Sequence, residues 1–299
     1  MQIQIAERLR PFSHQFGARC LLPGSDKVAC IYPAFAEFKG ERKIIFPIQG
    51  PVKRFSSTLN LDTGKLTVFG HYQSGYYKED IFSAEKVPIF ERVSFGCHKA
   101  QNWEAMRQRG SMAEWLPHWH RMAQWKGDIT RVEVAAEDTL LGQCQRVDRF
   151  GLEQAVKNLF EGSFEDYFVP TPERWEWLGL GLPPTDGPCP LVQGAALLRS
   201  ALIRSEGENL HFLPKLPQGL VCGRYIDAKF PWGTVHFEWT KGLLRRAVLV
   251  VSKTVTIQFH FQKELENCRL RKDGKEQVFN NNAVQLEERS TYYLDHFQK

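Results

Sequence analysis

The pattern of apolar and polar positions changes twice along the chain. The first part has short apolar runs broken by Gly and Pro, which is typical of strands and turns. The second has apolar residues at intervals of three and four, which is typical of helices. In the third part the period becomes two. The pattern predicts an N-terminal β-rich region (1–96), a helical region (97–208) and a C-terminal β-sandwich (209–299).

The clearest element of the first part is a hairpin over residues 57–70. Two β-prone arms flank Asp62-Thr-Gly-Lys, and these residue types favour a tight turn. Tyr72, Tyr76 and Tyr77 follow, and we expect them in a polar loop.

The helical region opens with a capping signal. Ser111 is followed three residues later by Glu114, the spacing of a capping box. Pro117 lacks the N–H that an interior turn needs, so it is expected to kink this helix or delay its start. A stripe of tryptophans is expected to pack in the core, since so wide an apolar face normally buries itself; its members are Trp103, Trp115, Trp119 and Trp125.

Two further helices are predicted. Residues 152–160 carry an apolar stripe, and Gly162 is a natural end for that helix. Residues 190–207 are mostly apolar and are expected to pack on several sides. Residues 125–150 have mixed periodicity and yield no prediction.

The last part alternates regularly. Val235, Phe237 and Trp239 alternate with polar residues, Lys241-Gly242 forms a turn, and residues 254–261 are typical of a half-buried antiparallel strand. Segregated strands and helices predict an α+β fold: an N-terminal antiparallel β-sandwich-like region, a helical middle and a C-terminal antiparallel β-sandwich. The two β regions either form separate units or share one extended core.

The composition limits the classes of partner that we expect this protein to bind. The net charge is +5, and the 39 basic residues are scattered among 34 acidic ones, so no nucleic-acid partner is predicted. No apolar stretch has the length of a signal peptide or a membrane span, so no membrane partner is predicted either. The seven cysteines include no CxxC pair, and free thiols indicate a cytoplasmic location. Export by a non-classical route would fit the same sequence.

Residues 190–251 carry a family resemblance. An apolar helix leads into NLHFLPKLPQGL, and the matching positions are Leu213-Pro214, Leu216-Pro217, Gly219, Gly223, Trp239 and Gly242. This passage resembles the end of the barrel and the C-terminal β-sandwich in the clan of inverting disaccharide (maltose and kojibiose) phosphorylases and 1,2-α-L-fucosidases. The resemblance covers about a fifth of the chain. It implies that prolines stiffen the crossover from helix to sheet and that Trp239 closes the sandwich.

The resemblance does not extend to the catalytic barrel. That family uses an (α/α)6 barrel of several hundred residues, whereas only about 110 residues lie between the β regions here. A complete barrel does not fit, and we carry over no catalytic residue.

A cluster of carboxylates and tryptophans is the richest source of candidate chemistry. Glycosidases use two carboxylates about 5–9.5 Å apart across the scissile bond. The acid–base candidates are Glu165, Asp166, Glu173 and Glu176, with Trp175 and Trp177 as sugar platforms. The favoured interpretation is a solvated acidic loop whose tryptophans cover the sandwich edge, since isolated carboxylates are not tuned for catalysis.

Other motifs indicate no metal or cofactor. Cys97-His98 has no third ligand at a useful spacing, and His118 and His120 are two apart, so they point to different sides of a helix. We expect these histidines at the surface or at helix caps. No GxSxG or phosphate-binding Gly-rich motif occurs in the sequence.

These observations favour a carbohydrate-associated, non-catalytic protein, glycoside hydrolase-like in architecture, with an oligosaccharide partner. Two alternatives stay open. One is an interaction or scaffold protein that keeps only the fold and binds another protein. The other is a reduced glycosidase using the loop carboxylates.

Overall fold

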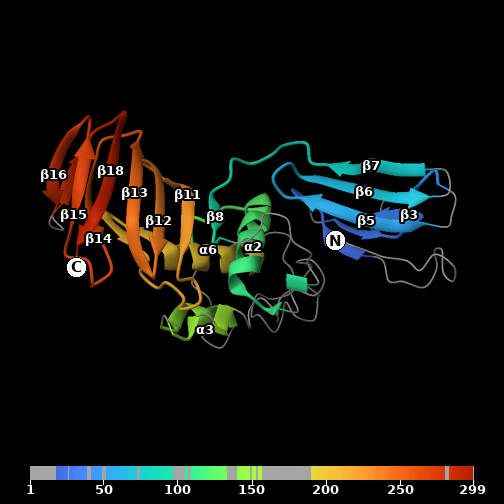
Figure 1. Cartoon of the computed structure of the whole chain (residues 1–299), viewed down its shortest axis with the longest axis horizontal. Coiled ribbons are helices and arrows are strands. Elements are labelled where there is room, and N and C mark those ends of the chain that lie inside the picture. Colours follow the sequence, from blue (N-terminus) through green and yellow to red (C-terminus); the bar gives the residue numbers. More distant parts are fainter. Residues whose placement is uncertain are drawn as a thin grey trace.

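The computed structural model places a β-sandwich at one end of an elongated molecule, helices in the middle and a second set of sheets at the other end (Figure 1). This arrangement confirms the predicted α+β fold. The structure describes residues 18–25, 27–38, 42–48, 52–72, 75–96, 105–106, 109–132, 140–148, 150–152, 154–156, 190–279 and 283–298.

The N-terminal sandwich consists of two antiparallel sheets. The first has the order β1-β2-β3-β4, with strands Ala18–Leu21, Val28–Ile31, Phe35–Phe38 and Arg42–Ile45. The second has the order β5-β6-β7, with strands Lys53–Asn60, Lys65–Tyr72 and Gly75–Ser83. The predicted hairpin is β5–β6, in which Asn60 pairs with Lys65.

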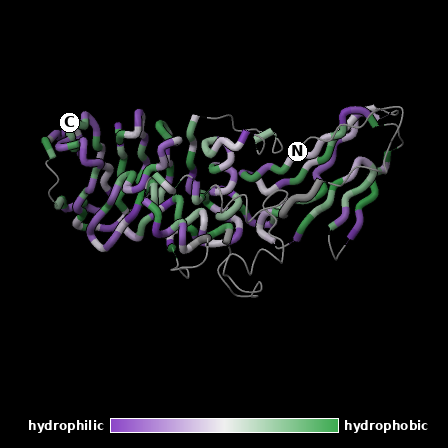
Figure 2. Tube along the Cα trace, turned by 90° about the horizontal axis from the view of Figure 1, so that it is seen from below, coloured by the Kyte–Doolittle hydropathy of each residue, from purple (hydrophilic) through white to green (hydrophobic). Residues whose placement is uncertain are grey.

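Alternation of side chains builds the core of this sandwich, and Figure 2 shows hydrophilic and hydrophobic positions interspersed along its strands. Ile31 and Phe38 from the first sheet and Phe55 and Val68 from the second are buried in one cluster. The predicted polar loop of tyrosines is wrong. Tyr72 is the buried last residue of β6, and β7 already begins at Gly75, so the two strands form a second tight hairpin.

Three helices are described in the middle: α2 (Met112–Lys126), α3 (Leu140–Arg146) and α6 (Pro190–Leu202). Ser111 is the N-cap of α2, but its side chain makes no capping hydrogen bond, and the Glu114 carboxylate forms a 2.8 Å ion pair with Arg109. Pro117 lies inside α2, so it does not delay the start of the helix. Trp115 and Trp119 are buried as predicted, whereas Trp103 lies outside the described residues.

Helix α6 is buried along nearly its whole length, as its apolar sequence predicts. It ends earlier than expected. Leu202 is its last residue, and Ile203–Glu206 form strand β9, which pairs antiparallel with β10. The β-branched Ile203 and the Gly207-Glu208 turn suit a hairpin better than a further helical turn.

The C-terminal part contains two more sheets. The larger has the order β16-β15-β18-β13-β12-β11-β8, with strands Lys275–Phe279, Asn267–Lys272, Ser290–Gln298, Leu243–Val251, Gly233–Thr240, Gly223–Phe230 and Arg92–Ser94. The smaller has the order β17-β14-β10-β9, with strands Ala283–Leu286, Val255–His260, Asn209–Phe212 and Ile203–Glu206. The expected half-buried strand β14 pairs antiparallel with β17 and parallel with β10.

Strand β8 connects distant parts of the sequence. It lies within the first 96 residues, yet it hydrogen-bonds to β11, with Ser94 opposite Arg224. The described residues also form two hydrophobic clusters. One fills the N-terminal sandwich, and the other is shared by the helices and the C-terminal strands. Phe212 and Phe237, with ring centroids 5.5 Å apart, join the two C-terminal sheets within the second cluster.

The end of α2 docks on the N-terminal sandwich through one tryptophan. Trp125 is buried, and its indole Nε1–H donates a 2.8 Å hydrogen bond to the Leu61 carbonyl in the β5–β6 turn. Gly64 in the same turn has φ +65°, and a Cβ there would lie 2.7 Å from the Trp125 ring. Glycine therefore meets both a backbone and a packing requirement of this contact.

The NLHFLPKLPQGL passage forms β10 and then the crossover to the larger sheet. The N–H groups of Leu213 and Lys215 donate to the carbonyls of Leu202 and Ala201 at the end of α6, at 2.8 and 3.1 Å. The buried indole of Trp239 donates a 2.8 Å hydrogen bond to the Leu220 carbonyl, and a Cβ on Gly223 would lie 2.4 Å from its ring. Packing therefore accounts for these positions of the resemblance. The family itself remains an expectation.

Candidate functional site

The loop residues singled out in the sequence cannot be placed. Glu165, Asp166, Glu173, Glu176, Trp175 and Trp177 lie outside the described residues, as do Cys97 and His98. The acid–base pair and the sugar platforms therefore stay predictions.

The expected surface position of the histidines is wrong for His120. This side chain is only 3% exposed and faces the C-terminal sheet, where its Nε2 lies 2.8 Å from the Tyr225 hydroxyl. Burial lowers the pKa of His120 to about 4, although nearby Glu91 opposes the shift. His118, on the other side of α2, is half-buried, and burial lowers its pKa too.

His120 belongs to a buried polar network centred on Glu91, which directly precedes β8. The Glu91 carboxylate accepts two hydrogen bonds from the Arg199 guanidinium of α6, at 2.8 and 3.0 Å. It also accepts one from the Tyr225 hydroxyl at 2.5 Å and one from the Lys229 backbone N–H at 2.7 Å, both on β11. We call Glu91, His120, Gln124, Arg199 and Tyr225 the buried network.

Helix α2 completes the buried network. The Gln124 side-chain oxygen accepts a 2.8 Å hydrogen bond from the Glu91 N–H, and its Nε2 lies 3.0 Å from both the Glu91 carbonyl and the His120 Nδ1. These partners assign the tautomer: Nδ1 of His120 accepts from Gln124, Nε2–H donates to Tyr225, and Tyr225 donates to Glu91. The imidazole is neutral and every ring nitrogen is bonded.

The charged and polar groups of the buried network satisfy one another within the protein. Burial by itself would raise the pKa of Glu91, but the hydrogen bonds and charge of Arg199, with Tyr225 and Lys229, hold it below the ordinary value. Burial and the neighbouring carboxylate raise the pKa of Tyr225 well above its usual range. Perturbed pKa values mark active sites, and they also mark structural ion pairs. Here each partner is already bonded within the protein, so the network joins α2, α6, β8 and β11 and leaves no group to act on a substrate.

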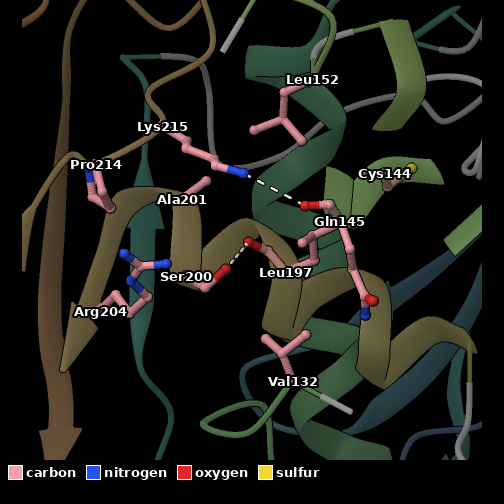
Figure 3. Close-up of a pocket in the computed structure, with 10 residues that line it drawn as sticks. All are labelled: Val132, Cys144, Gln145, Leu152, Leu197, Ser200, Ala201, Arg204, Pro214 and Lys215. Atoms are coloured by element: carbon pink, nitrogen blue, oxygen red, sulfur yellow. Dashed lines mark hydrogen bonds between the residues drawn. The ribbon is translucent and has the colours of Figure 1, made fainter. Parts of the chain in front are cut away.

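A pocket of about 240 Å³ lies between α3, α6 and the LPKLP passage (Figure 3). Its lining divides into an apolar part and a polar part. The lining residues are Val132, Cys144, Gln145, Leu152, Leu197, Ser200, Ala201, Arg204, Pro214 and Lys215. Val132, at 37% exposure, and Arg204, at 42%, reach solvent, whereas Leu152 and Leu197 are buried.

The polar groups of this pocket are more loosely held than those of the buried network. Lys215 extends across toward α3, where its Nζ lies 3.5 and 3.3 Å from the carbonyls of Gln145 and Val147 (Figure 3). The Arg204 Nε is 3.2 Å from a Glu206 carboxylate oxygen, and both side chains are substantially exposed. Ser200 donates to the Leu197 carbonyl at 2.7 Å, so its oxygen is free to accept.

The pocket is suited to binding and not to catalysis. Its ten lining residues include no carboxylate and no histidine, so they offer no general acid–base pair at neutral pH. The thiol of Cys144 is not a nucleophile either, because burial raises its pKa to about 12 and keeps it protonated.

Little in the sequence indicates this pocket. Helix α3 falls within residues 125–150, whose periodicity yields no prediction. Arg204 is expected on the helix over residues 190–207, but it lies on β9. The position of Lys215 between Pro214 and Pro217 is the signal that draws attention to this part of the chain.

Comparison with known proteins adds no relative: no family model matches the sequence, and no curated protein matches it. The helices that the structure describes include none long and apolar enough to cross a membrane. Within the same described residues, His, Cys, Asp and Glu side chains form no group of three or more that could hold a metal ion.

Proposed function

We propose that this chain is a carbohydrate-associated protein that binds a saccharide without turning it over, and that the pocket beside the LPKLP passage is the binding site. The proposal combines the family resemblance of residues 190–251 with the chemistry of that pocket. A volume of about 240 Å³ is suited to a small ligand such as a single sugar ring.

One observation carries the proposal: hydrogen-bonding groups surround an apolar floor in the pocket, and no catalytic pair accompanies them. Leu152 and Leu197 can contact the C–H face of a sugar, while Ser200, Arg204 and Lys215 can bond its hydroxyl groups. Small-molecule sites commonly combine such an apolar surface with a few polar groups that fix orientation.

A thermal-shift screen against mono- and oligosaccharides, including α-glucans and fucosylated glycans, tests the proposal. A ligand at 100 times its Kd stabilises the fold by about 2.7 kcal/mol, which shifts the melting temperature by several degrees. Ser200→Tyr should fill the pocket and abolish the shift. Ser83→Tyr, at the exposed end of β7 and outside the residues that line the pocket, should leave it unchanged.

Two results would contradict this assignment. If no saccharide stabilises the wild-type protein, the carbohydrate proposal fails. If a shift survives unchanged in a folded Ser200→Tyr variant, the saccharide binds elsewhere and the pocket is not its site.

An exposed apolar group on the N-terminal sandwich favours a second candidate function, binding to another protein. Ile45 on β4 is 74% exposed and pairs directly with Phe35 on β3, which stacks on Tyr32 with ring centroids 4.5 Å apart. The Lys43 ammonium lies 3.8 Å from the Phe35 ring centroid. Aromatic residues are enriched in the buried cores of protein interfaces. Ile45→Asp should abolish capture of such a partner and leave saccharide binding intact.

A further inference from the structure

We propose that the ligand of the pocket is an acidic saccharide whose anionic group, a carboxylate or a phosphate ester, pairs with the cationic side chains of the lining, chiefly with Lys215. This inference rests on the proposed function and specifies the class of sugar. Two cationic side chains, and no anionic one, are among the residues that line the pocket.

The hydrogen bonds of Lys215 leave its charge available. Its two carbonyl contacts, at 3.5 and 3.3 Å, are longer than the 2.7–3.2 Å of ordinary N–H···O bonds, and neither acceptor carries a formal charge. An anion adds the attraction between opposite formal charges, which a carbonyl dipole does not supply. An anion entering the pocket would therefore displace these weak contacts at little cost.

Arg204 is only partly committed to Glu206. The pair is a single 3.2 Å contact at Nε, with the two side chains 42% and 57% exposed, so solvent screens it. A guanidinium has five N–H donors in a planar fork, and a two-oxygen anion fits the other donors. Arg204 can therefore bind a ligand while it retains Glu206.

The other residues that line the pocket suit the ring and the hydroxyl groups of an acidic sugar. Leu152 and Leu197 provide the apolar floor, and the Ser200 oxygen can accept a hydrogen bond from a sugar hydroxyl. A neutral sugar could use the floor equally well, but it would leave Lys215, whose two acceptors are uncharged carbonyls, without a counter-charge. The charges thus select acidic sugars over neutral ones.

The test is isothermal titration calorimetry of the full chain with glucuronate, glucose 6-phosphate, glucose and inorganic phosphate. At least one acidic sugar should bind at least tenfold more tightly than glucose, and its affinity should fall as salt is raised. Lys215→Met should weaken that binding at least tenfold, and Lys215→Arg should retain most of it. Lys253→Met, at an exposed turn, is the matched charge control.

The outcomes separate this inference from the function it rests on. Equal binding of glucose and the acidic sugars overturns the acidic preference and leaves a saccharide site. Inorganic phosphate that binds as tightly as the best acidic sugar overturns it as well, because the sugar ring then contributes nothing. If no sugar binds, both proposals fail. The salt dependence of the wild-type protein decides the matter even if a variant does not fold.

Discussion

Two arginines near the end of α6 show how differently one stretch of chain can use the same side chain. Arg199 is 5% exposed and holds Glu91 through two hydrogen bonds, while a further N–H donates 2.7 Å to the Lys229 carbonyl. Arg204, five residues later, is 42% exposed and has one screened contact with Glu206.

This difference distinguishes polar groups that hold the fold together from polar groups that a ligand can bind. The buried network contains strongly perturbed pKa values, at His120 and Tyr225, which would make it a first choice in a search for an active site. Its bonds are nevertheless complete within the protein. The pocket has longer contacts, and the two acceptors of its Lys215 carry no formal charge, so a ligand can compete for this cation.

The strongest test of this comparison is Arg199→Met. Removing one partner of a buried pair leaves the Glu91 charge without compensation, and such changes cost about 3–5 kcal/mol. Urea unfolding should show that loss in the free energy of unfolding. The double variant Glu91→Leu/Arg199→Met should be more stable than Arg199→Met alone. A single variant as stable as wild type would mean that the network does not hold the helices to the sheet.

A second test uses pH and His120. Its pKa in the folded protein is about 4, below the unfolded value near 6.5, so the unfolded chain binds more protons between these values. The free energy of unfolding should therefore fall by about 3 kcal/mol as pH drops from 6.5 to 4, and protonation of Glu91 adds to the loss at the acid end.

Unfolding measured across this pH range in wild type and in His120→Asn isolates the contribution. The variant should show a shallower slope, even if it is less stable at every pH. His118 also titrates in the same direction and is present in both proteins, so it cancels. Identical slopes would show that His120 is not buried in its neutral form.

The smallest effect is expected for Lys215→Met. Its contacts are long and its side chain is only half-buried, so its loss should change the free energy of unfolding by less than about 1 kcal/mol. The same urea series as for Arg199→Met gives a direct comparison. A loss as large as that of Arg199→Met would move Lys215 from the binding site into the structural framework.

Local pattern predicted much of the fold. The β5–β6 hairpin, the burial of Trp119, the apolar character of α6 and the alternation along β12 all follow from residues close together in sequence. The prediction was wrong where two local signals conflict. Ile203 continues the apolar run of α6, which favours a helix, but it is the first residue of strand β9.

The buried network and the pocket could not be predicted in the same way, because the residues that form them are far apart in sequence. Glu91 and Arg199 are 108 residues apart, and no spacing rule relates them. The burial of His120 depends on β11 packing against α2, so residues near it in sequence do not indicate it. The pocket joins α3, α6 and β9, so it exists only once those elements are assembled.

The position of β18 in its sheet has a consequence for the order of synthesis. It is late in the sequence, yet it lies between β15 and β13 and pairs with both. On the ribosome, the N-terminal sandwich has all its strands by residue 83 and can fold early. The larger sheet must wait for residues 290–298, and until then β13 and β15 are left with open edges that favour aggregation or chaperone binding.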